Sequence, residues 1–337
     1  MKFLQIGLGS MGKRRIKCLI ANGQNEITGF DLSEKRRRES EKKFKIPTYR
    51  SFEKALDMNP DAVIISVPGY LHIQYLLQCV KAGKHTFTEV PLAVSPDGIS
   101  ELKKTVKEKN LICAPGCQLL FHPPTQALKD WVSAKDFGQL LNVSYTMGTY
   151  LPDWHPYENI QSFYASDLKK GGGNIDVIAQ EFVWLNWIIN SKIKEVTCRM
   201  GKTGNLPLAE GTPDHIEMII EYDNSLMMSL HFDVNDRTHE SYIRFAGENK
   251  TAVWSKTAFN SLVLYNSSDK KWTKYESPQN YDFELTYISE IAEWINCIKT
   301  GKLWPISIDA AENIVKVIKA FQISSDERRP VNLEEIQ

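Results

Sequence analysis

Short apolar runs alternate with amphipathic stretches along the first third of the chain. The runs lie at residues 3–6, 26–30, 62–67, 85–89 and 111–115, and the run 62–67 is rich in β-branched residues, as a buried parallel strand should be. The stretches between them carry apolar residues at helical spacing and predict helices at residues 11–21, 33–44, 71–82 and 97–109. This alternation is typical of βαβ units with right-handed connections, so we expect a doubly wound parallel sheet.

The pattern changes near residue 122. Further helices are predicted at residues 125–133, 171–189, 283–300 and 308–324, and strands at residues 140–150, 194–202, 215–222, 225–235, 242–247 and 261–266. Successive strands without helices between them predict an antiparallel sheet, and the polar residues 222–225 predict a hairpin turn. We therefore expect an α/β protein of two domains. The parallel sheet spans residues 1–122, and residues 123–337 form an α+β domain with an open, mostly antiparallel sheet, whose last helices are free to pack back on the first domain.

The composition excludes several classes of protein. The 337 residues are 42% hydrophobic and 24% charged, which is the balance of a globular rather than a disordered chain. Lys plus Arg equals Asp plus Glu at 41 each, which argues against a nucleic-acid partner because that usually requires a basic face. The longest apolar run is too short to span a membrane, and six cysteines without a Cys-x-x-Cys pair are typical of reduced thiols. We expect a cytoplasmic protein with no membrane partner.

A glycine-rich turn follows the first predicted strand. It has the sequence Gly7-Leu8-Gly9-Ser10-Met11-Gly12, and Asp31 ends the second predicted strand. A Gly-x-Gly-x-x-Gly turn between a strand and a helix, with an acidic residue at the next strand end, is the dinucleotide-binding fingerprint of the Rossmann fold. Gly7 permits the tight turn, and Gly12 permits close approach of helix and strand. Gly9 leaves room for a pyrophosphate, which the N–H groups of Ser10 and Met11 at the helix start would bind.

The acidic residue bears on the choice of cofactor. Asp31 is expected to bind the adenosine ribose hydroxyls and to repel a 2′-phosphate, which favours NAD over NADP. Arg36, Arg37 and Arg38 offer an alternative, because one of them could pair with a 2′-phosphate. The other interpretation is that they belong to a solvated, salt-bridged helix face. We favour the second interpretation, and NAD with it.

Three further motifs accompany this turn. They are Val-Pro-Gly-Tyr-Leu-His at residues 67–72, Glu-Val-Pro-Leu-Ala at residues 89–93 and Gly-Gly-Gly-Asn-Ile-Asp at residues 171–176. In this order, and over nearly its whole length, the chain resembles the Gfo/Idh/MocA oxidoreductase family. The resemblance implies a nicotinamide cofactor held between a Rossmann domain and a C-terminal α/β domain, and a sugar, polyol or amino-sugar substrate.

The same resemblance places further residues beside the cofactor. Val67 and Pro68 are implied to lie against its nicotinamide half, at the carboxyl end of a parallel strand where such sheets bind ligands. His72 is implied to shape the pocket without acting as a catalyst. Glu89 is implied to bond to cofactor ribose or to backbone, and Pro91 belongs to the same motif.

The chain departs from the family at two catalytic positions. Val90 stands where the resemblance implies a catalytic lysine, and Gln180, four residues after Asp176, stands where it implies a histidine. Valine cannot exchange a proton and glutamine does not titrate, whereas general acid–base assistance contributes about 10²–10⁴-fold in rate. By position, Asp176 and Gln180 remain candidates for catalysis and for substrate binding.

Residues 150–158, just before the glycine run, are dense in groups that bind polar ligands. His155 is our first candidate for a replacement acid or base, because imidazole titrates near neutrality, and Tyr164 is a further catalytic candidate. The expected substrate-binding residues are Gln118, Asp153, Trp154 and Tyr157. The alternative for each is a packing or capping role. The stretch is similar to members found with surface-polysaccharide biosynthesis, which implies an amino sugar, nucleotide sugar or nonulosonic acid.

Two further expectations concern metals and assembly. His215 and His231 lie on predicted strands with no carboxylate or cysteine at a metal spacing to either, so no metal site is predicted. Trp254, Trp272 and the run 226–230 are expected on the open sheet, whose exposed face is implied by the resemblance to form the subunit interface. An uncovered apolar sheet face is a liability in a monomer, so we expect a homodimer or homotetramer.

The sequence thus leaves two hypotheses. The first is an NAD(P)-dependent oxidoreductase acting on a small sugar-type molecule, with a replaced proton-handling group. The alternative is a cofactor-binding pseudoenzyme, or a partner subunit of an active homologue, that lacks the family's lysine and histidine. We favour the enzyme, because a proton relay is more easily replaced than a cofactor site is retained unused.

Overall fold

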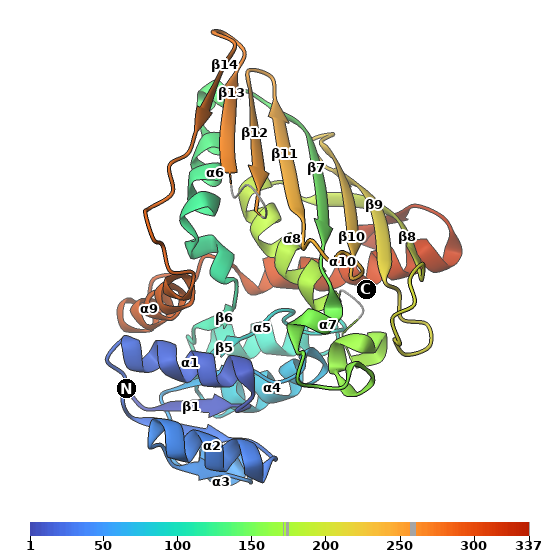
Figure 1. Cartoon of the computed structure of the whole chain (residues 1–337). Coiled ribbons are helices and arrows are strands. Elements are labelled where there is room, and N and C mark those ends of the chain that lie inside the picture. Colours follow the sequence, from blue (N-terminus) through green and yellow to red (C-terminus); the bar gives the residue numbers. More distant parts are fainter. Residues whose placement is uncertain (171, 173–174, 257–260, 337) are drawn as a thin grey trace. The chain divides into compact units, whose positions relative to one another are not determined.

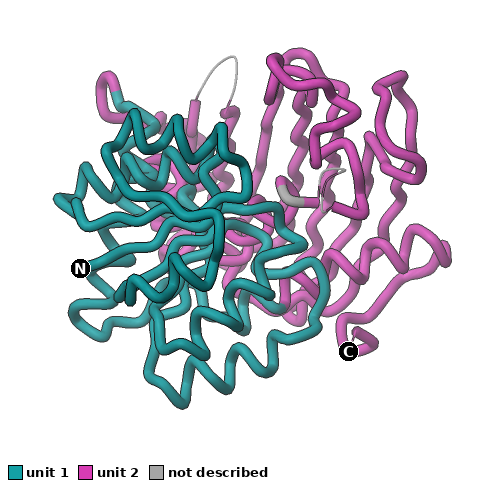
Figure 2. The backbone as a smooth tube through the Cα atoms, turned by 90° about the horizontal axis from the view of Figure 1, so that it is seen from below, with its two compact units in different colours: residues 1–121, 281–312 teal, residues 122–280, 313–337 magenta. Residues whose placement is uncertain are grey.

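The computed structural model of this chain describes residues 1–170, 172, 175–256 and 261–336, and of Asp176 the backbone alone (Figure 1). The chain forms two compact units, shown in teal and magenta in Figure 2. Unit 1 consists of residues 1–121 and 281–312, and unit 2 of residues 122–280 and 313–337. No helix in the described part of the chain is long and apolar enough to cross a membrane.

Unit 1 is built on a six-stranded parallel sheet with the strand order β3-β2-β1-β4-β5-β6. The strands are β1 (Phe3–Ile6), β2 (Ile27–Phe30), β3 (Thr48–Tyr49), β4 (Ala62–Ile65), β5 (His85–Thr88) and β6 (Cys113–Pro115). All residues of β1 and β4 are buried, as expected for strands covered on both faces. This is the strand order of the Rossmann fold, and it confirms the predicted parallel sheet. The short β3 escaped prediction.

Helices connect these strands. They are α1 (Ser10–Ala21), α2 (Glu34–Phe44), α3 (Phe52–Leu56), α4 (His72–Lys81) and α5 (Ile99–Glu108), with the short turns η1 (Gly69–Leu71) and η2 (Gln118–Phe121). A late segment of the chain, α9 (Glu284–Thr300), returns to this unit and packs against α1. Its Trp294 is fully buried against Phe3 of β1 and Phe87 of β5.

Unit 2 is built on a second sheet, in which the described residues form nine strands. Their order is β14-β13-β12-β11-β7-β10-β9-β8-β15. The strands are β7 (Leu140–Gly148), β8 (Ile193–Gly201), β9 (His215–Tyr222), β10 (Met227–Asp233), β11 (Ser241–Gly247), β12 (Lys250–Ser255), β13 (Ser261–Asn266), β14 (Lys271–Lys274) and β15 (Val331–Asn332). Only the pair β7–β10 is parallel among them, so the mostly antiparallel sheet is confirmed. The hairpin between β9 and β10 is confirmed as well.

One face of this sheet is covered and the other is open. In β9 the residues alternate, with Ile216, Met218 and Ile220 buried and the residues between them exposed or half-exposed. Trp184 of α8 (Ile175–Ile189) packs edge-to-face on Trp254 of β12, so α8 lies on the covered face. The unit also contains α6 (Pro123–Ser133) and α7 (Leu151–Trp154). The helix α10 (Ile308–Glu327) begins in unit 1 and ends in unit 2. The short turns are η3 (Lys135–Phe137), η4 (Ile160–Ser162), η5 (Tyr164–Ser166), η6 (Leu168–Lys170) and η7 (Leu333–Glu335).

The expectation for the exposed face of this sheet was partly wrong. Trp254, Leu226 and Leu230 are at most 2% exposed and belong to the covered face, because successive side chains of a strand point to opposite faces of the sheet. Trp272, on β14, is 58% exposed as expected. The strands β12 and β14 also escaped prediction.

Candidate functional site

The glycine-rich turn sits on the carboxyl ends of β1 and β4. Gly7 has a φ of +84°, and a Cβ there would lie 2.3 Å from the carbonyl oxygen of Ser66. A Cβ at Gly12 would lie 1.8 Å from the carbonyl oxygen of Gly7. Neither position admits another residue without moving the backbone. These two glycines are therefore required by the fold itself.

Gly9 differs from its two neighbours in the motif. A Cβ at this position would meet only Arg36, whose Nη1 is 4.0 Å away, so nothing in unit 1 requires a glycine here. Gly9 is the residue before α1. No side chain caps the helix start, and the first turn contains no acidic residue. The N–H groups of Ser10 and Met11 head this helix of twelve residues and are suited to an anion. The room at Gly9 therefore fits a pyrophosphate passing close to the backbone.

Asp31 is tied to this turn. Its Oδ2 accepts a hydrogen bond of 2.8 Å from the N–H of Leu8, and its Oδ1 accepts one of 2.8 Å from the N–H of Ser33. The guanidinium of Arg36 lies 3.8 Å from Asp31 Oδ2. Arg37 donates to the carbonyls of Asp31 and Leu32, and Arg38 pairs with Glu34 one helical turn away. Of the three arginines, Arg36 alone faces the carboxylate that would meet the ribose.

The loops after β4 and β5 are held together by one histidine. His72 is 1% exposed, and its Nδ1 and Nε2 lie 2.6 Å and 2.8 Å from the carbonyl oxygens of Pro91 and Val67. Burial lowers the pKa of His72, although both carbonyls act in the opposite direction. Val67 lies 3.0 Å from the Cβ position of Gly7. The glycine turn, Val67, Pro68 and Pro91 thus gather at the carboxyl end of the sheet, where the strand order reverses between β1 and β4.

Glu89 is engaged by groups that the sequence pattern did not indicate. Arg15 of α1 binds both of its carboxylate oxygens, with Nε–Oε1 and Nη2–Oε2 distances of 2.8 Å and 2.7 Å, and Ser66 donates a third hydrogen bond. Arg15 also binds the fully buried Glu290 of α9 at 2.6 Å. Burial raises the pKa of a carboxyl group, but Arg15 outweighs it at Glu89, whose pKa is lowered. This carboxylate therefore braces α1 against β5, and its part in cofactor binding stays a prediction.

The candidate residues of α8 are only partly described. Gln180 is half-buried on this helix, whereas the side chain of Asp176 lies outside the described residues. The next residue, Glu181, is buried, accepts hydrogen bonds from Tyr145 and Trp184 at 2.6 Å each, and lies 3.1 Å from Lys256 Nζ. Sequence reasoning missed this polar cluster, which bridges α8 to the covered face of the sheet. Gln118, in η2 of unit 1, is half-buried.

Residues 150–166 form a small packed layer in unit 2. The indole N–H of Trp154 donates to Thr149 Oγ1 at 2.7 Å, and Tyr164 packs on Phe163. Asp153 Oδ2 lies 3.2 Å from His239 Nε2. The structure thus places Trp154 and Tyr164 against the apolar cluster formed by Leu151, Phe163, Ala165 and Val234.

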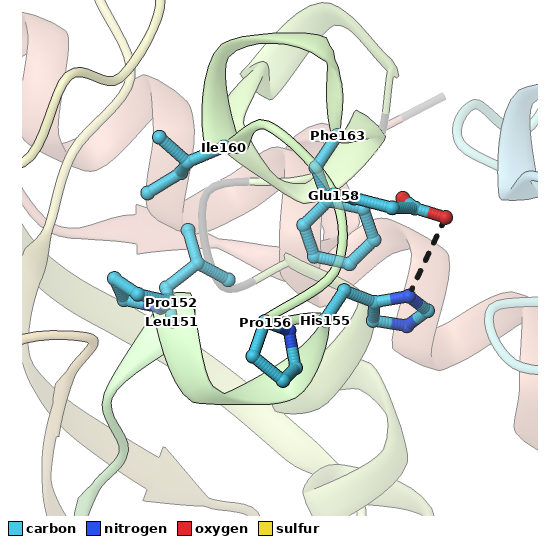
Figure 3. A pocket seen from close by; sticks show the side chains of 7 residues that line it. All are labelled: Leu151, Pro152, His155, Pro156, Glu158, Ile160 and Phe163. Atoms are coloured by element: carbon cyan, nitrogen blue, oxygen red, sulfur yellow. Dashed lines mark ion pairs between the residues drawn. The ribbon is translucent and has the colours of Figure 1, made fainter.

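His155 lies at the rim of this layer beside a cavity of about 190 Å³ (Figure 3). Its ring is 4.5 Å from that of Phe163, centroid to centroid, and its Nδ1 lies 3.0 Å from the Tyr157 hydroxyl and 3.7 Å from Glu158 Oε1. Tyr157 is 74% exposed. The other residues that line the cavity are Leu151, Pro152, Pro156 and Ile160. The cavity is therefore mostly apolar, with one histidine–carboxylate pair at its edge.

The histidines of the second sheet were misinterpreted in one respect. Glu217 stands two residues after His215 on β9, and its Oε1 lies 2.7 Å from His231 Nδ1 on β10. The statement that no carboxylate accompanies these histidines is therefore wrong. The pattern was legible, because residues i and i+2 of a strand share a face. The expectation that no metal binds remains a prediction from sequence.

Comparison with known families decides the class of the protein. Residues 1–117 match the model of the oxidoreductase family with an NAD-binding Rossmann fold, and residues 125–253 match the Gfo/Idh/MocA C-terminal domain. The chain belongs to the Gfo/Idh/MocA oxidoreductase family. The resemblance inferred from the motifs is thereby confirmed, and with it the oxidoreductase class and the nicotinamide-binding fold.

Relatives in the Gfo/Idh/MocA family include dehydrogenases of cyclic polyols. Myo-inositol 2-dehydrogenase of Thermotoga maritima is 21% identical and is matched over 100% of this chain and 99% of its own length. Inositol 2-dehydrogenase of Corynebacterium glutamicum is 25% identical over 72% of this chain and 68% of its own. The solved structure of levoglucosan dehydrogenase with NADH and levoglucosan shares the fold, with a TM-score of 0.87, 15% identity and 99% coverage of both chains.

The interpretation that Val90 and Gln180 replace two catalytic residues of the Gfo/Idh/MocA family stays a prediction from the sequence. Val90 is half-buried between Glu89 and Pro91, and Gln180 is half-buried on α8. Neither side chain can donate and recover a proton during catalysis. The glycine turn, by contrast, keeps its motif glycines and its acidic residue in the expected arrangement.

Proposed function

We propose that this protein is an NAD-linked oxidoreductase that interconverts a hydroxyl and a carbonyl group on a sugar-type substrate. The observation that carries the proposal is the difference between the three glycines of the turn in the space available for a side chain. Gly7 and Gly12 are required by the fold, whereas Gly9, between them at the start of α1, is not required by it and leaves the backbone open to a ligand. The bound nicotinamide supplies the hydride acceptor or donor. The chain must then bind the substrate, orient its carbon, and give or take the proton of its oxygen.

The preference for NAD rests on Asp31. Its carboxylate is fixed by the N–H groups of Leu8 and Ser33 and is 8% exposed, so it stands where the ribose hydroxyls of the adenosine would lie. A 2′-phosphate at this place would meet a fixed negative charge. Arg36 at 3.8 Å partly offsets that charge, so we expect NADPH to bind more weakly than NADH rather than not at all.

The substrate class is supported by the relatives and by residues 150–158. Relatives are named as dehydrogenases of inositol and levoglucosan, which are cyclic polyhydroxylated molecules. Within that class we propose an amino sugar, nucleotide sugar or nonulosonic acid of surface-polysaccharide biosynthesis, because residues 150–156 are similar to members with those substrates. Asp153 and Tyr157 offer exposed polar groups for such a molecule.

His155 is our proposed replacement for the missing proton-handling residues. Its imidazole is within reach of the Tyr157 hydroxyl and near Glu158, so a proton released by the substrate could pass to Nδ1 or Nε2. Aromatic packing on Phe163 restricts the orientation of the ring. Tyr164 packs in the same layer and is a weaker candidate. We also propose a cytoplasmic homo-oligomer formed through the open sheet face, where Ile219, Met227 and Tyr242 are exposed.

A titration of the purified protein with NADH tests the cofactor half. Energy transfer from the eight tryptophans reports binding. In Gly9→Ala we expect the Kd for NADH to rise at least about tenfold, because the added methyl group stands where the pyrophosphate passes. The free energy of unfolding should change by less than about 0.5 kcal/mol, because the methyl meets no protein atom closer than 4.0 Å.

Gly201→Ala is the matched control. A Cβ there also meets nothing within 4 Å, and the residue lies on β8 in the other unit, so NADH affinity should stay unchanged. Equal affinity of wild type and Gly9→Ala would contradict the assignment of the turn. Tight NADH binding without turnover on any polyol or sugar would favour the alternative, a cofactor-binding partner subunit, which Val90 and Gln180 support.

A further inference from the structure

Two histidines and two carboxylates form a two-by-two block on the open face of the unit 2 sheet. His215 and Glu217 alternate along β9, and His231 and Asp233 alternate along β10. In the antiparallel register Glu217 stands opposite His231, and His215 stands opposite Asp233. Alternate residues of a strand share a face, and directly opposed Cβ atoms are about 4.5–5.5 Å apart. The four side chains are therefore neighbours, with the histidines on one diagonal and the carboxylates on the other.

Three of these side chains converge on one point. Glu217 Oε1 lies 2.7 Å from His231 Nδ1 and 3.5 Å from His215 Nε2. The ligand atoms of all three residues are within 4.8 Å of one another, and the two imidazole rings meet edge-on at 5.4 Å. Two imidazole nitrogens and one carboxylate oxygen at this spacing form a donor set that Zn²⁺ uses with a fourth position open to water.

The fourth residue orients His231. Its Nε2 lies 3.1 Å from Asp233 Oδ2, while its Nδ1 faces Glu217. A neutral imidazole has a single N–H group, so it cannot donate to both carboxylates. With the proton on Nε2 bonded to Asp233, the lone pair of Nδ1 points at the carboxylate of Glu217, and only a proton or a metal ion between them makes that arrangement favourable. A carboxylate on the far nitrogen is the usual support of a metal-bound histidine.

The competing occupant of this position is a proton. Partial burial lowers the pKa of His231, but the hydrogen bonds and charges of Glu217 and Asp233 outweigh it, and the net pKa is raised. A metal ion at this position would therefore take the place of a proton on Nδ1.

The surroundings leave the cluster accessible. On β8, Gly201 stands opposite His215, and a Cβ there would meet nothing within 4 Å. The side chains of His215 and His231 are 32% and 31% exposed. The nearest cation in the register, Arg199, stands opposite Glu217, but its Nη1 donates to the carbonyls of Cys198 and Ser324. In the single chain, solvent and a hydrated ion can thus reach the two rings, and in the proposed homo-oligomer the same face would meet a second copy.

We propose that His215, Glu217 and His231 bind a divalent metal ion of the Zn²⁺ class, with Asp233 as the residue that orients His231. The ion would clamp β9 to β10 and keep one position for water. This site is independent of the proposed oxidoreductase function, because none of its residues belongs to the candidate cofactor or substrate residues.

The test is a Zn²⁺ titration of the metal-stripped full-length protein against a chromogenic chelator. We expect one Zn²⁺ per chain, and a loss of affinity of about tenfold or more in His215→Gln, His231→Gln and Glu217→Gln. Asp233→Asn should weaken binding by about tenfold, because it disturbs a supporting hydrogen bond rather than a ligand. Mg²⁺ should not compete, because it prefers oxygen ligands in octahedral geometry. The visible spectrum of Co²⁺ bound at the site should disappear in the ligand variants.

His239→Gln is the control for histidine content. This histidine lies outside the cluster and is bonded to Asp153, so its loss should leave Zn²⁺ affinity unchanged. The substituted side chains lie on the open face of the sheet, and circular dichroism will establish that the variants are folded. A stoichiometry far below one, or affinity that is equal in wild type and all three ligand variants, would overturn the proposal and leave a protonated His231 held between two carboxylates.

Discussion

The glycine turn of unit 1 and residues 150–166 of unit 2 position their candidate site residues by different physical means. In the turn, the backbone itself sets the geometry, because a Cβ at Gly12 would lie 1.8 Å from the carbonyl oxygen of Gly7. In residues 150–166, the geometry is set by contacts between side chains. The indole of Trp154 is bonded to Thr149, and His155 packs on Phe163.

This difference explains which half of the site can be inferred from sequence. A position whose surroundings exclude every side chain can hold only glycine. The backbone geometry there can therefore be inferred from the glycines in the sequence. A side-chain contact such as that between His155 and Phe163 can be satisfied by many residue pairs. The pattern therefore indicates that residues 150–158 can bind a ligand, but not which of them pack and which face outward.

The two units also bury charge differently. In unit 1, Arg15 is 1% exposed and is bound by two carboxylates, Glu89 and Glu290. In unit 2, the side chain of Lys256 is 17% exposed and approaches a single carboxylate, Glu181, among aromatic rings. In the first cluster one cation serves two carboxylates, each of which has only one other hydrogen-bond donor, whereas Glu181 alone keeps two other donors.

The largest effect that we predict follows from this difference. Arg15→Met should lower the free energy of unfolding by about 3–5 kcal/mol, because it leaves two carboxylates without their cation, each with a single neutral hydrogen-bond donor, Ser66 for Glu89 and the Cys117 N–H for Glu290. Lys256→Met should cost only about 1–2 kcal/mol, because the hydroxyl of Tyr145 and the indole of Trp184 still bind Glu181. Urea unfolding monitored by tryptophan fluorescence measures both.

The pH dependence sharpens the same comparison. Burial raises the pKa of Glu290 even with Arg15 in place, and without Arg15 it should raise the pKa of Glu89 as well. A buried carboxyl group with a raised pKa destabilises the fold when it is ionised and not when it is protonated, so the cost of Arg15→Met should shrink as the pH falls toward the ordinary carboxylate range. Equal losses for Arg15→Met and Lys256→Met at neutral pH would show that burial of charge does not distinguish the units.

Most of the fold was predictable, and the reasons for the failures are local. Strand β4 is a continuous buried run, so its pattern is unambiguous. Strand β14 (Lys271–Lys274) is exposed throughout at the edge of its sheet and carries no apolar alternation. The contact between Arg15 and Glu290 joins residues 275 positions apart, so no local pattern contains it. The pair of His215 and Glu217 could be read from one strand, but the approach of His231 to it depends on the register between β9 and β10.

The second prediction addresses residues 150–166. With the polyol or sugar that the wild-type protein turns over fastest, His155→Asn should lower kcat by about 10²-fold, with little change in KM. Tyr157→Phe should lower kcat only a few-fold, because Tyr157 is 74% exposed and the variant keeps the ring contact with His155 while losing the hydroxyl that lies beside its Nδ1.

The packing of His155 on Phe163 requires a stability control. Unfolding of His155→Asn must be measured beside its kinetics, because a loss of folded protein would mimic a loss of kcat. A folded His155→Asn variant with full turnover would refute the proton-handling role and leave the position as a packing residue of the layer.

The smallest predicted effect tests how the glycine turn chooses its cofactor. Arg36→Gln should weaken NADPH binding by about three- to tenfold and leave NADH nearly unchanged, because Arg36 is the arginine that faces Asp31 and the cation that a 2′-phosphate would meet. Arg38→Gln is the matched control on the same helix, since Arg38 pairs with Glu34 and is 76% exposed. Tryptophan energy transfer to each reduced cofactor measures both variants. Tighter binding of NADPH than of NADH by the wild type would contradict the role of Asp31, because a fixed carboxylate at the ribose cannot favour an added phosphate.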